Sequence, residues 1–354
     1  MPGRQKYTIV QELGAGGMGR VYKGTLVGQA GFTRPIVVKK LREGQDPAHV
    51  RLFVEEAARY AVLDHDNIGR IFDFERVSGE LSIILEWIDG WSLVEFLERH
   101  REVKRLPDVD LSVFIVSRVC RALQYVFERA AIVHRDVSPS NIMMTREGTV
   151  KLIDFGIATR SGTKDSSLTG KPAYMAPEMV LDLRADSRSD LFSLGAVFFE
   201  MLTLERLFKG GTPAEILEQV ISGRVPSPRE QNPAIPEGVM AILRKSLQRD
   251  PAQRYSSAGE MGQACEHHLY DEGYGPTNLA LKRYLSTLFP PEAHSSDDMP
   301  SLSADLIPME EAAKEDPADL TPIVPIVPLA LAEAAPASSK RRAAGRGPGR
   351  TRTG

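Results

Sequence analysis

The chain has 354 residues, of which 42% are hydrophobic, and its 44 Lys and Arg nearly balance its 47 Asp and Glu. This length predicts one large or two smaller domains, and the net charge of −3 argues against a global binder of nucleic acid or membrane. Two cysteines, Cys120 and Cys265, exclude a disulfide scaffold and a Cys-rich zinc module and fit a reducing compartment. The start, MPGRQKYTIVQEL, does not resemble a signal peptide, and no stretch of about 18 apolar residues occurs. We therefore expect a cytoplasmic protein with no membrane partner.

The first part of the chain, residues 7–88, is predicted to be rich in strands. Five segments carry many β-branched residues: YTIVQEL, RVYKGTLV, RPIVVKKL, IGRIFDFE and LSIILEWI. Between them, PAHVRLFVEEAARYAVLDH has apolar residues near helical spacing. From about 92 to 289 helical patterns dominate, as in LSVFIVSRVCRALQYVFERA at 111–130. The pattern predicts a small strand-rich lobe followed by a large helical lobe.

Composition changes near residue 290. Residues 290–354 contain 10 of the 24 prolines and no Phe, Tyr or Trp, so they have too little apolar surface to offset the entropy of ordering. Residues 292–319 carry nine Asp or Glu against one Lys, whereas 340–354 carry six basic residues and no acid. We expect a disordered Pro/Ala-rich tail with an acidic first half and a basic end, which is either solvated or binds an unknown protein partner.

A glycine-rich segment lies near the start of the chain. Gly14, Gly16 and Gly19 form G-x-G-x-x-G, followed by Val21, and glycines let backbone N–H groups approach phosphate oxygens. A flexible hairpin tip and a dinucleotide-binding turn are the alternatives, but the dinucleotide turn requires a helix directly after the loop. Here an alternating strand, RVYKGTLV, follows. The loop is therefore predicted to join two strands, as in the glycine-rich loop of protein kinases.

Three more motifs follow in order: HRDVSPSN at 134–141, DFG at 154–156 and APE at 176–178. With the glycine-rich loop and IVVKKL, they span about 7–270, and the chain resembles the eukaryotic-like Ser/Thr protein kinases of bacteria. The resemblance implies an α+β, two-lobed protein kinase fold over 7–289, with one key helix in the small N-lobe. It also implies a signalling enzyme that uses ATP and Mg²⁺, or Mn²⁺, to phosphorylate Ser/Thr hydroxyls of protein substrates.

The resemblance assigns residues to the phosphates of ATP. Lys39 is expected to bind the α- and β-phosphates, because VVK matches the family motif in frame and leaves Lys40 on the other face of the strand. Glu56 lies nine residues before His65 and is expected to pair with Lys39, with Glu55 as the alternative. This pair would form only when its helix is docked, which makes it a gate on activity.

The same resemblance implies the remaining parts of the site. Asp136 is expected to accept or orient the proton of the substrate hydroxyl, and Asn141 and Asp154 to bind magnesium through hard oxygen donors. In the hinge, the carbonyl of Glu86 and the N–H of Ile88 would contact adenine, next to Leu85. The expected nucleotide site further contains Leu13, Gly14, Ala15, Gly16, Gly17, Met18, Gly19, Val21, Val37 and Met143. For Val21, Val37 and Met143, plain core packing is the alternative role.

Two positions depart from the family pattern. Ser138 stands where the family carries a lysine two residues after the catalytic aspartate, and Lys171 stands where it carries a threonine before the APE segment. We expect Lys171 to extend back toward Asp136 and to supply the charge that Ser138 lacks. A solvated Lys171 and a slow enzyme are the alternative.

Structural and regulatory roles follow from other matches. Asp190 is expected to brace the HRD backbone, and Glu178 and Arg254 to form a buried ion pair that anchors the APE segment. Arg135 is basic and precedes the catalytic aspartate, so it is predicted to meet an activation-loop phosphate. Autophosphorylation is expected at Thr163, Ser166 or Ser167, with an ordinary polar loop as the alternative.

Two other classes of function compete with an active protein kinase. A nucleotide-binding pseudokinase or scaffold is favoured by Ser138 alone and opposed by the intact catalytic set. A small-molecule phosphotransferase is opposed by the segment PAYMAPE, which such enzymes lack.

Overall fold

The computed structural model describes residues 7–15, 19–28, 31–41, 63–77, 80–154, 159–160, 171–182, 186–271 and 273–290. The predicted helix at 47–65, apart from its last three residues, lies outside these ranges, as do the tip of the glycine-rich loop at 16–18 and the predicted tail beyond residue 290.

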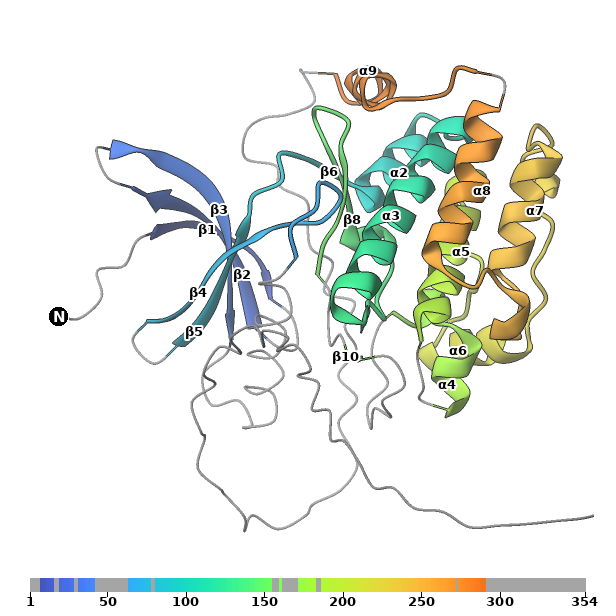
Figure 1. The fold of residues 1–354 in the computed structure, drawn as a ribbon, viewed down its shortest axis with the longest axis horizontal. Coiled ribbons are helices and arrows are strands. Elements are labelled where there is room, and N and C mark those ends of the chain that lie inside the picture. Colours follow the sequence, from blue (N-terminus) through green and yellow to red (C-terminus); the bar gives the residue numbers. More distant parts are fainter. Residues whose placement is uncertain are drawn as a thin grey trace, which may run out of the picture. The chain divides into compact units, whose positions relative to one another are not determined.

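A five-stranded antiparallel sheet forms the first lobe, in the order β1-β2-β3-β5-β4 (Figure 1). Its strands are β1 (Tyr7–Ala15), β2 (Gly19–Val27), β3 (Thr33–Leu41), β4 (Ile71–Val77) and β5 (Glu80–Glu86). The five strands predicted from β-branched composition are therefore confirmed. Side chains alternate between the two faces: Ile83 packs with Leu81, whereas Ile84 packs with Ile36 and Val38.

Helices dominate the second lobe, as predicted. They are α2 (Leu93–Glu102), α3 (Val109–Ala130), α4 (Pro177–Asp182), α5 (Ser187–Thr203), α6 (Pro213–Ser222), α7 (Glu237–Ser246), α8 (Ala258–Tyr270) and α9 (Asn278–Leu288). In Figure 1, α3, α5, α7 and α8 stand beside one another as a bundle. No helix in the described ranges is long and apolar enough to cross a membrane.

Helix α5 lies inside this lobe. It is buried from Ser189 to Thr203, and its flanking partners α3, α7 and α8 cover it. Asp186 caps its N-terminus by accepting the N–H of Arg188. A helix buried on every side provides a rigid support for the segments that pack on its first turn.

Short strands precede the HRD and DFG segments. β6 (Gly90–Ser92), β8 (Ile142–Thr145) and β9 (Val150–Leu152) form a three-stranded sheet, and β7 (Ile132–Val133) pairs with β10 (Thr159–Arg160). The HRD segment follows β7 and the DFG aspartate follows β9, and the ring of His134 contacts the carbonyl of Ile153, just before that aspartate.

Candidate active site

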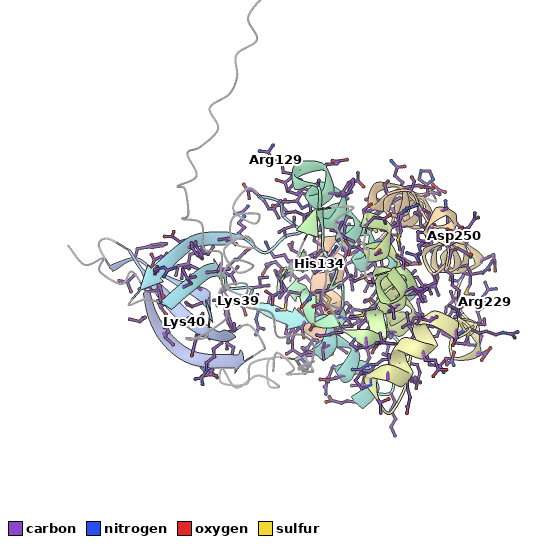
Figure 2. All side chains as sticks on the ribbon, turned by 90° about the horizontal axis from the view of Figure 1, so that it is seen from below. Lys39, Lys40, Arg129, His134, Arg229 and Asp250 are labelled. Carbon is purple, nitrogen blue, oxygen red and sulfur yellow. The ribbon has the colours of Figure 1, made fainter. Side chains whose placement is uncertain are left out.

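Lys39 connects the two lobes. Its ammonium lies 3.1 Å from Oδ1 of Asp154, and the lysine side chain is only 15% exposed. Lys40, the next residue on β3, instead lies over the ring of Tyr22, with its Nζ 5.9 Å from the ring centroid. Figure 2 shows both lysines on the sheet and His134 in the helical lobe. The predicted Lys39–Glu56 pair lies outside the described residues.

Asp190, in the first turn of α5, holds the HRD backbone as predicted. Its carboxylate accepts the N–H of His134 and the N–H of Arg135, each at 2.8 Å. Burial raises the pKa of Asp190 to about 7, against the lowering effect of these two N–H groups. The backbone of the HRD segment is thus held in place by the first turn of the buried helix α5.

The ring of His134 orients the start of this loop. Nδ1 of His134 accepts the N–H of Asp136 at 3.2 Å, so Nε2 carries the proton and donates to the carbonyl of Ile153 at 3.1 Å. Burial lowers the pKa of His134 to about 4. The neutral ring therefore links the HRD segment to the residue before Asp154.

Asp136 and Asn141 face one another across a short turn. Nδ2 of Asn141 donates to Oδ2 of Asp136 at 2.8 Å and to its carbonyl at 2.7 Å. Burial raises the pKa of Asp136 to about 6, while the ammonium of Lys171 and the bond from Asn141 act to lower it. A carboxylate held this way is suited to take or orient a hydroxyl proton near neutral pH.

Asp154 has the opposite electrostatic setting. The ammonium of Lys39 lowers the pKa of Asp154, more than burial raises it. The backbone at Asp154 has φ +50°. Ile153, the residue before it, donates its N–H to the carbonyl of Asn141 at 2.9 Å, which holds Asp154 near Asn141. An ionised carboxylate and an amide oxygen are the hard donors that Mg²⁺ prefers, so this donor set fits such an ion.

Lys171 reaches the catalytic loop from a segment 31 residues further along the chain than Ser140. Its backbone N–H donates to Oδ1 of Asp136 at 3.2 Å, and its ammonium donates to Oγ of Ser140. Ser140 in turn lies 3.2 Å from Oγ of Ser138 and donates to Oδ1 of Asn141 at 3.2 Å. Sequence reasoning missed Ser140, because only the fold brings this hydroxyl to Lys171.

The residues predicted to surround the nucleotide base lie on β2, β3 and β8. Val21 pairs with Lys39 across the β2–β3 ladder, and Val37 lies two residues before Lys39, so all three share one face of the sheet. Met143, on β8, is 9% exposed. Of the predicted phosphate loop, Leu13, Gly14 and Gly19 lie on β1 and β2, the side chain of Ala15 is not described, and Gly16, Gly17 and Met18 fall outside the described residues.

The predicted hinge follows β5. Oε2 of Glu86 accepts from the ammonium of Lys151 at 3.0 Å and from the N–H of Arg70 at 3.1 Å. The N–H of Glu86 donates to the carbonyl of Arg70 at 2.8 Å. Ile88, two residues later, is half-buried. The backbone at Glu86 is therefore fixed by the segment before β4, a contact that the motifs did not reveal.

The APE segment is anchored as predicted. The side chain of Arg254 is fully buried, and its guanidinium donates to both carboxylate oxygens of Glu178, each at 2.7 Å. Tyr174, just before the APE motif, donates to Oε2 of the buried Glu200 at 2.7 Å. These contacts fix the segment that contains Lys171 onto the helical lobe.

Comparison with known proteins agrees with this geometry. A family model described as protein kinase domain matches residues 7–270. Tyrosine-protein kinase MasK of Myxococcus xanthus is 31% identical over 78% of this chain and 45% of its own length. Serine/threonine-protein kinase PrkC of Bacillus subtilis is 32% identical over 72% of this chain and 39% of its own. Serine/threonine-protein kinase PknB of Mycobacterium tuberculosis is 32% identical over 72% and 42%. The chain spans less than half the length of these curated relatives.

Proposed function

Because the chain belongs to the protein kinase family, we propose that it transfers the γ-phosphoryl group of ATP to Ser or Thr hydroxyls of proteins. One observation carries the proposal: two side-chain pairs lie side by side. Lys39 lies 3.1 Å from Asp154, and Asn141 donates to Asp136 at 2.8 Å. Ile153, the residue before Asp154, donates its N–H to the carbonyl of Asn141 at 2.9 Å and so joins the two pairs. Phosphoryl transfer requires little more than such positioning and charge neutralisation.

Each residue has a defined task in this proposal. Lys39 holds the α- and β-phosphates, and its charge also keeps Asp154 ionised. Asn141 and Asp154 hold a divalent cation, for which we propose Mg²⁺, and that ion would neutralise charge on the phosphates. Asp136 accepts or orients the proton of the attacking hydroxyl, with Asn141 fixing one of its oxygens.

We further propose that Lys171 supplies the positive charge that Ser138 lacks. The contact of its ammonium with Ser140, beside Asn141, supports this role. The effect of the Lys171 charge on the pKa of Asp136 supports it too, since an ammonium remote from the carboxylate would not lower that pKa. A lysine arriving from the segment before α4 would then serve where the family uses one from the catalytic loop.

Tyrosine is the competing acceptor, because the relative MasK is named a tyrosine-protein kinase. The names PrkC and PknB, and the absence of the pattern HRDLAARN from the chain, favour Ser/Thr. The two readings differ in the phosphoamino acid formed. Phosphoamino acid analysis of the reaction product therefore decides between them.

The regulatory assignments are also proposals. The buried Arg135 precedes the catalytic aspartate and supports autophosphorylation at Thr163, Ser166 or Ser167, which lie outside the described residues. The two free, buried cysteines support a reducing, cytoplasmic setting. A protein partner for the segment beyond residue 290 rests on its charge pattern alone.

Autophosphorylation with Mg²⁺-ATP tests the proposal, read by intact mass and phosphosite mapping beside an Asp136→Asn control. Phosphate on Ser or Thr of the unmodified chain, and none on the control, is expected. Phosphate only on tyrosine would favour the competing acceptor. ATP binding without any transfer would support a pseudokinase, with Ser138 as the departure to examine.

A further inference from the structure

One cavity shares Glu86 with the predicted hinge but none of the described residues proposed for phosphoryl transfer. Its volume is about 640 Å³, and it is bounded by the segment before β4, the end of β5, α3, β9, the end of α8 and the start of α9. Among the described residues, its lining includes none of Lys39, Asp136, Asn141 or Asp154. Four cations line it: Arg70, Arg118, Arg121 and Lys151.

Arg118 and Arg121 lie three residues apart on α3, so their side chains share one face of that helix. The guanidinium of Arg118 stacks on Phe114, with its Cζ 4.4 Å from the ring centroid, and its side chain is 14% exposed. Burial and the neighbouring charge of Arg121 lower the pKa of Arg118. The positive charges of these two guanidiniums repel one another.

The donors of Arg118 are incompletely used. Nη2 donates to the hydroxyl of Tyr270 at 3.3 Å, and Nη1 lies 3.7 Å from Oε1 of Glu266. Its Nε is buried, and within the described part of the chain it has no hydrogen-bond partner. A buried donor without a partner is uncommon in folded proteins.

Four carboxylates lie in or beside the cavity, but Arg118 and Arg121 share one of them, Glu266. Asp66 and Glu86 line the cavity, and Glu86 is paired with Lys151 at 3.0 Å. Glu266 accepts from Arg121 at 2.6 Å, and Arg70 lies 3.0 Å from the exposed Asp64. Thr277 and Asn278, at the N-terminus of α9, also line the cavity and add the positive end of a helix dipole.

We propose that this cavity binds the dianion of a phosphate monoester, with Arg118 and Arg121 as its main ligands. Guanidinium groups match phosphate oxygens in pairs, and a dianion offsets their mutual repulsion better than a single carboxylate does. The cavity is larger than inorganic phosphate requires, so it leaves room for the organic part of the ester. That part is either a protein segment with phosphoserine or phosphothreonine, or a small phosphorylated metabolite.

Isothermal titration calorimetry of the full chain, in the absence of nucleotide, tests the proposal by measuring the affinity for phosphorylated probes. The probes are inorganic phosphate, O-phosphoserine, and a phosphoserine peptide with its unphosphorylated copy. Arg121→Gln is the main variant, because this side chain is 51% exposed and its replacement leaves the core intact. Arg118→Gln is the second, and a thermal unfolding midpoint reports whether each variant is folded. Arg129→Gln, exposed on the last turn of the same helix, is the matched control (Figure 2).

Binding of a phosphorylated probe at one site, weakened about ten- to a hundredfold by Arg121→Gln and unchanged by Arg129→Gln, is expected. If the phosphoserine peptide binds more tightly than O-phosphoserine, the phosphate monoester belongs to a protein segment. If the two bind equally, it belongs to a small metabolite. The proposal is overturned if no phosphorylated probe binds, or if Arg129→Gln weakens binding as much as Arg121→Gln. It is also overturned if Lys39→Met removes the binding, since the probe then occupies the nucleotide site.

Discussion

The carboxylate of Asp190 accepts the backbone N–H of Arg135 at 2.8 Å, and Arg135 is held there with φ +65°. A non-glycine residue in this left-handed region costs on the order of 1–3 kcal/mol. The hydrogen bonds from α5 offset that cost immediately before Asp136. Strain in the catalytic loop is therefore balanced by a residue that has no chemical task of its own.

Replacement of Asp190 by Asn tests this balance. The amide NH₂ would face a backbone N–H, so one hydrogen bond is lost, and a loss of about 1–3 kcal/mol in the free energy of unfolding is expected. The kcat should fall with it, because the backbone before Asp136 is released. Urea unfolding and steady-state kinetics measure the two effects. Asp250→Asn, at a helical cap on the surface, is the control and should change neither, since Asn caps as well as Asp.

The pKa of Asp136 predicts a pH dependence of activity. In the role proposed for Asp136 the carboxylate form is the active one. Burial raises its pKa to about 6, so kcat/KM should rise as the pH increases through about 6 and level off above 7. The charge of Lys171 lowers this pKa, so Lys171→Met should move the midpoint to a higher pH. A pH–rate profile of both proteins measures this, and an unmoved midpoint would contradict the placement of the ammonium.

The role proposed for Lys171 predicts a specific rescue. Lys171→Thr should lower kcat by on the order of 10²–10³, as loss of a charge that stabilises the transition state does. Adding Ser138→Lys should recover much of that loss, because the ammonium returns to the same place from the catalytic loop. Steady-state kinetics of the two single variants and the double variant measure the coupling. Unchanged turnover of Lys171→Thr would refute the role.

The buried ion pair between Glu178 and Arg254 predicts a loss of stability. Glu178→Gln leaves the fully buried side chain of Arg254 without its counter-charge. The free energy of unfolding should therefore fall by about 3–5 kcal/mol. Urea denaturation measures it. Glu237→Gln removes a carboxylate that pairs with Arg229 and Arg244 at the surface and should leave the unfolding midpoint unchanged. If the two substitutions lowered the free energy of unfolding equally, burial of the Glu178–Arg254 pair would make no additional contribution to stability.

Much of the fold follows from local patterns in the sequence. The five strands of the first sheet follow from alternation and β-branched residues, and the long helix α3 from apolar spacing. Alternation also separates Lys39 from Lys40, and the structure places Lys39 against Asp154. Asp190 and the Glu178–Arg254 pair follow from the motif match, because each motif carries its structural partners with it.

Contacts between distant segments did not follow from the sequence. Ser140 has no motif of its own, and its contact with Lys171 exists only because the APE segment folds back over the catalytic loop. The pair of Lys151 with Glu86 and the cavity beside it combine elements from six parts of the chain. Such sites depend on tertiary packing, which short-range periodicity does not encode.

The contact of Lys171 with Ser140 also constrains how such a sequence arises in evolution. A change from the usual family arrangement to this one requires two substitutions in segments that are far apart in the chain. An ancestor that first lost its catalytic-loop lysine would have had no ammonium at the site, while one that first gained Lys171 would have had two repelling ones. The second order keeps at least one ammonium beside the catalytic loop at every stage. Related sequences that carry both lysines are therefore the expected intermediates.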